Sequence, residues 1–193
     1  MSKRKQNSFG TLSYLSTTQY ATVRHYIALN SETQEIEAFE LTDLGGQDWE
    51  GFENLIEEIE KELGDVIGDG AYDRFPCYKL ATTKKFKLIV PPQRNARNSE
   101  ERKKKISKAK RVFLQGRDAT IKTVREIGRV EWKKEARYHR RSLVETLMFR
   151  IKTILGSRLS SRLFENQKVE TAIWCKIINH MTQLGMPISY VID

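Results

Sequence analysis

The sequence predicts a mixed α/β fold, and three observations indicate it. In the first half, short segments with apolar residues at alternating positions are interrupted by one segment with helical periodicity. The apolar segments of the second half have helical periodicity. No stretch approaches the roughly 18 uncharged apolar residues of a membrane span. We therefore expect one mixed sheet with flanking helices and no membrane partner, in a chain of 193 residues that can bury a core.

Four strands and one long helix are predicted in the first half. The turn-like Asn30-Ser31-Glu32 joins the first two strands into a β-hairpin. Apolar residues then recur at spacings of three and four, which predicts a helix that ends near Gly64. Asp69 is the last residue of the third strand, and Pro91-Pro92 stop the fourth. The strands are residues 23–28, 35–41, 65–69 and 86–90, and the helix is residues 49–63.

The rest of the chain is predicted as helices after a basic segment. Residues 94–111 are polar and basic with little apolar surface, so we expect a loop that turns into a helix. The basic residues 1–20 are expected to be an unstructured N-terminus, ahead of one domain over residues 21–193. The predicted helices of the second half are residues 118–127, 140–155 and 168–181.

The cysteines and the N-terminus indicate a cytoplasmic protein. Cys77 and Cys175 are far apart and form no C-x-x-C pair, which argues against a disulfide framework or a thiolate zinc site. The basic start is not followed by the apolar region of a signal peptide. We therefore expect a reducing compartment.

The net charge of +9 is divided into blocks of opposite sign. Residues 32–73 carry a net charge of −14, whereas residues 74–168 carry a net charge of +20. This asymmetry predicts a basic face that follows a phosphate backbone, beside an acidic cluster. Two solvated faces that stabilise each other are the alternative, and charge alone does not separate the two.

Four polar residues share one stripe of a predicted helix. At 100° per residue, Tyr138, Arg141, Glu145 and Lys152 fall within about 60° of one another, opposite the apolar face. An exposed helix face with an Arg141–Glu145 ion pair would explain the stripe structurally. A metal-dependent phosphoryl-transfer site also needs a carboxylate for the cation and positive charges for phosphate oxygens. That function requires a second carboxylate, and Asp69 is the candidate because small residues follow it.

These residues resemble a known family, the DDE transposases of bacterial insertion sequences. The spacing Tyr138-x2-Arg141-x3-Glu145-x6-Lys152 is similar to their Y-R-E-K signature. Their second-Asp motif resembles Gly68-Asp69-Gly70-Ala71-Tyr72-Asp73. Between this motif and the signature, the family has a proline-rich segment that resembles Val90-Pro91-Pro92-Gln93-Arg94-Asn95-Ala96. The stretch from Phe164 to Pro187 is similar to the family's C-terminus. Four motifs in the right order make the resemblance specific.

The resemblance implies a ribonuclease H-like core in which three carboxylates hold two Mg²⁺ ions, which Mn²⁺ can replace. Asp69 and Glu145 would be the second and third carboxylates, both catalytic and metal-binding. The implied reaction is cleavage of DNA at insertion-sequence ends followed by strand transfer into target DNA. The complete enzyme would be a homo-oligomer in the bacterial cytoplasm. The residues implied or favoured to contact DNA are Tyr138, Arg141, Lys152, Lys103, Lys104, Lys105 and Arg94.

One departure from the family concerns the first catalytic Asp. In the family this residue lies on a strand before the hairpin. No acidic residue precedes Glu32 in this chain. We therefore expect the C-terminal part of a transposase catalytic domain, from a truncated copy that lacks the first strand and the first carboxylate. Such a chain would bind DNA weakly and cut it poorly.

Two other functions stay open. The chain would be a non-catalytic DNA-binding remnant, or an inhibitor that occupies the DNA ends or partner subunits of the full-length transposase. A general nuclease with a ribonuclease H-like core also uses carboxylates and metal, but it explains the positions of Tyr138, Arg141 and Lys152 less well.

Overall fold

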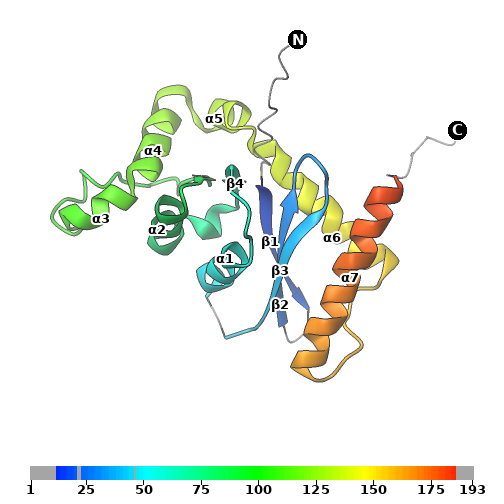
Figure 1. Ribbon diagram of the computed structural model, residues 1–193. Coiled ribbons are helices and arrows are strands. Elements are labelled where there is room, and N and C mark those ends of the chain that lie inside the picture. The colour runs from blue at the N-terminus through cyan, green and yellow to red at the C-terminus, as the bar shows by residue number, and fades with distance from the viewer. Residues whose placement is uncertain (1–11, 21–22, 46, 186–193) are drawn as a thin grey trace, which may run out of the picture.

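The computed structural model describes residues 12–20, 23–45 and 47–185, with the backbone alone for residues 12–20. A central sheet has helices on both faces, and a group of helices extends from one edge (Figure 1). The strands are β1 (Leu12–Tyr20), β2 (Val23–Asn30), β3 (Ile36–Asp43), β4 (Asp65–Ile67) and β5 (Lys87–Ile89). The helices are α1 (Asp48–Glu57), α2 (Phe75–Lys84), α3 (Lys108–Phe113), α4 (Gln115–Ile127), α5 (Arg129–Glu135), α6 (Ser142–Ile154) and α7 (Phe164–Leu184), with the 3₁₀ turns η1 (Gly70–Tyr72) and η2 (Tyr138–Arg141).

The five strands form one mixed sheet in the order β3-β2-β1-β4-β5. β1, β2 and β3 are antiparallel neighbours, as expected of strands joined by short turns. β4 is parallel to both β1 and β5. The crossovers that parallel pairing requires are made by α1 and α2. The predicted mixed sheet with flanking helices is confirmed.

The predicted absence of a strand before the hairpin is corrected by β1. Residues 12–20, which we had assigned to an unstructured N-terminus, pair with the whole of β2, from Leu12 opposite Asn30 to Tyr20 opposite Val23. Ser13 also pairs with Ile67 of β4, so β1 is the central strand. Sequence reasoning missed it because serine and threonine interrupt the apolar pattern of this segment.

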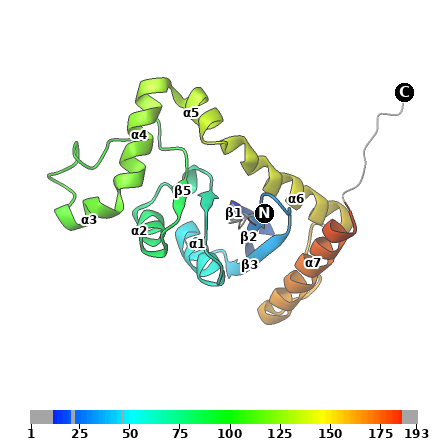
Figure 2. The same ribbon diagram turned by 45° about the horizontal axis from the view of Figure 1, so that its top comes forward.

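Alternation along the strands places one hydrophobic core on each face of the sheet. On β2, Tyr26 and Ala28 are buried in the core beneath α1 and α2. Ile27 and Leu29 lie in the second core, with residues of α6 and α7. Neighbouring residues of β4 and β5 divide between the two cores in the same way. The result is a sheet between two helical layers, seen from a second side in Figure 2.

Gly51 lets α1 lie close to the sheet. A Cβ atom on Gly51 would be only 2.4 Å from the ring of Tyr26. Any larger residue would push α1 away from β2 or displace a fully buried tyrosine. The helix that the 49–63 periodicity predicted is thus present, but it ends at Glu57, before Gly64.

The second half is helical, as predicted, with additional breaks. The helices expected over residues 118–127, 140–155 and 168–181 correspond to α4, α6 and α7. The helix expected at the end of the 94–111 segment corresponds to α3. The short helix α5 was not predicted, because seven residues hold too few apolar positions to show a period. Among the described residues, no helix is both long enough and apolar enough to cross a bilayer.

Candidate active site

Asp69 lies in the turn that directly follows β4. It is half-buried and is the N-cap of η1, where its carboxylate accepts a hydrogen bond from the backbone N–H of Ala71 at 2.7 Å. The preceding Gly68 is buried, and a Cβ atom there would meet the ring of Tyr72 at 2.8 Å. Small residues therefore let the chain turn sharply and hold Asp69 at the end of the strand.

Glu145 comes to the site from the first turn of α6. Its side chain is 55% exposed and forms an ion pair with Arg141 one turn earlier, at 2.5 Å. The structural explanation of the stripe, an i, i+4 pair, is thus present. It does not exclude a functional role, because a guanidinium beside a carboxylate can also contact phosphate.

Tyr138 connects the two carboxylates. Burial raises the pKa of its phenol, Arg141 lowers that pKa, and the negative charges of Asp69 and Glu145 raise it. The charges of both carboxylates thus reach one phenol, although Asp69 follows β4 and Glu145 belongs to α6. The Arg141–Glu145 pair could be expected from the spacing, whereas the effect of Asp69 on Tyr138 could not.

The stripe is built differently from the single helix that was predicted. Tyr138 and Arg141 belong to the 3₁₀ turn η2, and α6 begins at Ser142. Side chains three residues apart are eclipsed in a 3₁₀ helix, so Tyr138 and Arg141 still share an edge. Lys152 is exposed near the end of α6, roughly 10 Å along the axis from Glu145. It therefore lies further from Tyr138 than the other members of the stripe.

A small cavity beside Tyr138 adds basic residues that the sequence did not single out. It has a volume of about 260 Å³. The ammonium group of Lys133 lies 5.4 Å from the centre of the Tyr138 ring, which also packs on Trp132 at 5.9 Å. The two adjacent lysines, Lys133 and Lys134, are the sequence feature from which these basic residues could have been found. The lining residues are Lys133, Lys134, Tyr138, His139, Arg141 and Ser142.

Carboxylates suit a hard divalent ion. Mg²⁺ is commonly held by one or two carboxylates, with water and substrate phosphate completing its octahedron. Asp69 and Glu145 are of the residue type that such a site uses. In the part of the chain that the structure describes, no three His, Cys, Asp or Glu residues form a metal-binding group.

The register of β1 against β4 indicates which positions of β1 could supply a further carboxylate beside Asp69. Because Ser13 pairs with Ile67 in parallel strands, the residues just after Ser13 run alongside Asp69. That segment of β1 reads Leu-Ser-Tyr-Leu-Ser-Thr-Thr-Gln-Tyr and holds no acidic residue. The strand that we expected to be missing is thus present, and residues 12–20 include no Asp or Glu.

The basic segment predicted to be a loop is fastened to α4. Ser99 donates its backbone N–H to Asp118 at 2.9 Å, and Glu101 pairs with Arg125 at 2.5 Å. Glu100 pairs in turn with Arg111 at 2.6 Å. Both acids of this segment are thus paired, Glu100 within the segment and Glu101 with α4.

Lys103, Lys104 and Lys105 lie in the turns before α3 and are exposed. Arg94 is also exposed, soon after β5. Because Glu100 and Glu101 are paired with arginines, the three lysines keep a concentrated positive charge. The three lysines precede α3, which lies at the outer end of the helices that extend from the sheet (Figure 1); residues 94–127, which include α3 and α4, are called the arm.

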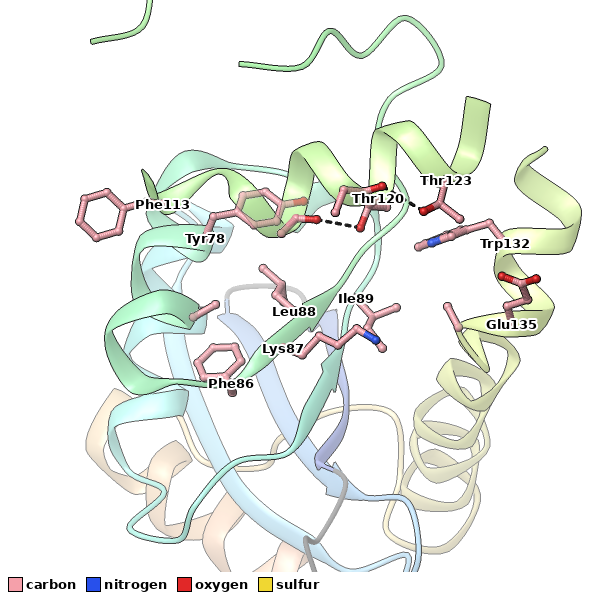
Figure 3. Close-up of a pocket in the computed structure, with 14 residues that line it drawn as sticks. Tyr78, Phe86, Lys87, Leu88, Ile89, Phe113, Thr120, Thr123, Trp132 and Glu135 are labelled. Atoms are coloured by element: carbon pink, nitrogen blue, oxygen red, sulfur yellow. Dashed lines mark hydrogen bonds between the residues drawn. The ribbon is translucent and has the colours of Figure 1, made fainter. Parts of the chain in front are cut away.

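A cavity of about 530 Å³ lies between β5, α2, α4 and α5. Its lining combines apolar side chains such as Leu88 and Trp132 with polar ones such as Glu135 (Figure 3). Thr120 and Thr123 donate their hydroxyls to carbonyls of their own helix. Neither Asp69 nor Glu145 lines this cavity, so it is separate from the candidate site.

Comparison with known protein families identifies the family of this chain. Residues 3–181 match the family described as the transposase DDE domain. The chain therefore belongs to the transposase DDE domain family. Membership implies a ribonuclease H-like fold, DNA as partner, and phosphoryl transfer with a divalent metal. The match begins ahead of β1, in agreement with the strand's place in the sheet.

Proposed function

We propose that this chain is a transposase domain of bacterial insertion sequences, of the branch with the Y-R-E-K signature, acting on insertion-sequence ends in the cytoplasm. The observation that supports the proposal best is the Arg141–Glu145 ion pair at 2.5 Å within the signature, with the charges of Glu145 and Asp69 both acting on the phenol of Tyr138. Asp69, from the turn after β4, and Glu145, from α6, would form the site with the signature's tyrosine and arginine. An ordinary surface ion pair would explain Arg141 and Glu145 but not Asp69.

The proposed roles follow from the chemistry of each side chain. Asp69 and Glu145 would hold a divalent ion, which when bound would activate water or a DNA 3′-hydroxyl for in-line attack on phosphorus. Arg141 would orient Glu145 and present its remaining N–H groups to a phosphate oxygen. Lys152, further along α6, would act as a point charge on the DNA backbone.

The cavity beside Tyr138 suits one phosphate group of the bound DNA. Lys133, Lys134 and Arg141 supply positive charge around a volume of about 260 Å³. The cation–π contact with Tyr138 holds Lys133 over the ring. A DNA end seated here would place a phosphate beside Arg141, the ion-pair partner of Glu145.

The arm is proposed to follow the DNA backbone away from the site. Lys103, Lys104 and Lys105 are exposed cations, and the pairing of Glu100 and Glu101 with α3 and α4 leaves them unopposed by the nearest acids. Phosphate contacts of this kind position DNA without reading its sequence. Arg94 would extend the contact toward Asp69.

The residue types of β1 favour binding over cutting. A site with two carboxylates where the family uses three would hold a single ion weakly and cleave DNA slowly. A second function is therefore a DNA-binding inhibitor of a transposase that carries all three carboxylates. Both functions require DNA binding through the same face.

DNA binding tests the proposal directly. Fluorescence anisotropy with a labelled duplex would measure affinity for the chain and for a variant with Lys103, Lys104 and Lys105 replaced by alanine. We expect that variant to lose at least about tenfold in affinity and to show a smaller salt dependence. A control variant replaces the exposed Lys79, Lys84 and Lys176, which removes the same charge elsewhere.

If both variants lose the same DNA affinity, binding depends on total charge alone. That result would contradict the assignment of Lys103, Lys104 and Lys105 to the DNA-binding face. Adding Arg141→Gln should weaken binding further, because it removes a phosphate contact at the site itself. Competition for DNA with an active transposase of the same element would then test inhibition. An inhibitor would displace that transposase from the DNA, whereas a chain without this function would not.

A further inference from the structure

An apolar stripe runs along the outer face of α7. Five of its apolar side chains are spaced by four, four, four and three residues, which places them on one side of the helix. A large apolar residue exposed singly is ordinary, whereas five in a row form a patch. Their exposed fractions are 59% for Val169, 51% for Ile173, 38% for Ile177, 36% for Met181 and 77% for Leu184.

The opposite face of α7 is fastened to the sheet, so the helix cannot turn to bury the stripe. The side chain of Asn179 accepts a hydrogen bond from the backbone N–H of Ile36 at 2.7 Å and donates one to its carbonyl at 2.9 Å. Gln183 donates to Glu35 at 2.8 Å. The residues of α7 buried on this face are Gln167, Thr171, Trp174, Cys175 and Ile178.

The stripe is large enough to form the centre of an interface. Five side chains with these exposures present on the order of 500 Å² of accessible surface, near the upper range for the largest patch on a monomer. Two such faces brought together would bury on the order of 1,000 Å², the lower bound for a specific interface. Lys176, with an aliphatic stem, lies beside the stripe and can direct its charge to solvent.

We propose that the α7 stripe, Val169 to Leu184, is the contact surface between two copies of this chain. The first four members form one ridge of residues four apart, and two such ridges interdigitate when helices cross at about −50°. A two-fold axis through Ile177 makes the contact self-complementary, with Ile173 of one copy against Met181 of the other. The pairing is therefore antiparallel and uses the same residues twice.

This pairing leaves the candidate active site accessible. Figures 1 and 2 both place α7 at the end of the molecule opposite α3 and α4. The dimer would carry its two basic arms on its outer ends. Because α7 contributes none of the residues assigned to DNA, the inference stands on observations other than those behind the proposed function.

The mass of the chain in solution, measured without DNA, tests the surface. Light scattering on a sizing column should give about twice 22.5 kDa for the wild type. Ile173→Glu and Ile177→Glu should give a single chain, because each places a charge in the apolar contact. The matched control is Val130→Glu on α5, where the valine is 72% exposed and outside the stripe.

Circular dichroism of each variant would show that it is folded. A monomeric wild type at micromolar concentration would overturn the proposal, as would a dimer that survives both glutamate substitutions. If residues 186–193 or a different protein cover the stripe, the purified wild-type chain is monomeric, which is the same negative outcome.

A cross-linking experiment does not depend on any loss of folding. In Ile177→Cys, the new thiols of two copies would meet at the two-fold axis and form a disulfide-linked dimer under mild oxidation. The native Cys77 and Cys175 are buried and should not react. Val130→Cys is the control, and equal cross-linking of the two variants would contradict the assigned surface. DNA affinity is not involved, so failure here leaves the proposed function untouched.

Discussion

Arg117 of α4 holds Asp73 through a two-point ion pair, with Nε 2.6 Å from Oδ1 and a terminal nitrogen 3.2 Å from Oδ2. Asp73 closes the motif that begins at Gly68, and its side chain is only 1% exposed. Tyr78 donates to the same carboxylate at 3.0 Å, and the backbone N–H of Gln93 donates at 3.3 Å. One buried carboxylate thus joins the turn of Asp69, the proline-rich segment and the helical arm.

Removing Arg117 should destabilise the protein strongly. Arg117→Met would leave the Asp73 carboxylate buried without its main counter-charge, at a cost of about 3–5 kcal/mol in the free energy of unfolding. Urea denaturation followed by circular dichroism measures this loss. Arg125→Met is the control, because its pair with Glu101 lies at the surface and should matter much less. Similar losses in both variants would show that the buried pair has no special role.

A pair of glycines should respond to alanine in opposite directions. Gly51→Ala places a methyl group 2.4 Å from the ring of Tyr26 and should destabilise the fold by about 1–3 kcal/mol. Gly116 lies near the start of α4 with no other atom within 4 Å of a built Cβ. Gly116→Ala should therefore stabilise by about 0.5–1 kcal/mol, because alanine favours the helix. Thermal denaturation would measure both, and a stabilising Gly51→Ala would contradict the close packing of α1 on β2.

Stability should fall in mild acid because of His25. Burial lowers the pKa of this imidazole from 6.5 to about 4, while the charge of Glu170 partly opposes the shift. Between those values the unfolded chain binds a proton that the folded chain does not, so stability rises with pH across the window. His25 alone should remove about 3 kcal/mol between neutral pH and pH 4, with no further loss below that.

Urea denaturation at several pH values tests this dependence on His25. His25→Phe should flatten the profile between pH 4 and 6.5, because no group remains at this position to take up the proton. His180→Gln, at an exposed position on α7, should keep the wild-type profile. An unchanged slope in His25→Phe would exclude His25 as the cause.

An acid restored on β1 should increase metal-dependent DNA cleavage. Ser13 pairs with Ile67, so Tyr14, Leu15 and Ser16 are the positions that run alongside Asp69. Aspartate introduced at one of them should complete a three-carboxylate site and raise cleavage of a labelled duplex by at least about tenfold with Mg²⁺ or Mn²⁺. Gln19→Asp, further along the same strand, serves as the control for added charge.

The gain should disappear when Asp69→Asn is combined with the active variant. Strong cleavage by the wild-type chain that is lost in Asp69→Asn would show instead that two carboxylates suffice. No gain at any of the three positions would contradict the proposed reason for slow cutting.

Local sequence signals determined much of the fold. Period-two alternation in β2 and β3 and the spacing of apolar residues in α1, α6 and α7 reflect how each element buries one side, so the periodicity is visible residue by residue. The same signals predicted Asp69 at the tip of a short buried strand, although β4 ends two residues earlier, at Ile67. Residue spacing also brought Arg141 and Glu145 to one edge, since that contact spans only one turn.

Only the tertiary structure decided how these parts meet. β1 has a weak apolar pattern, and its place in the centre of the sheet depends on pairing with β2 and β4. The approach of Asp69 to Tyr138, and of Asp73 to Arg117, joins residues 69 and 44 positions apart in the chain. Such contacts depend on the packing of several elements at once, and no local period encodes them. The sequence determined which chemical groups are present, and the packing of the elements decided that the charges of Asp69 and Glu145 both act on Tyr138.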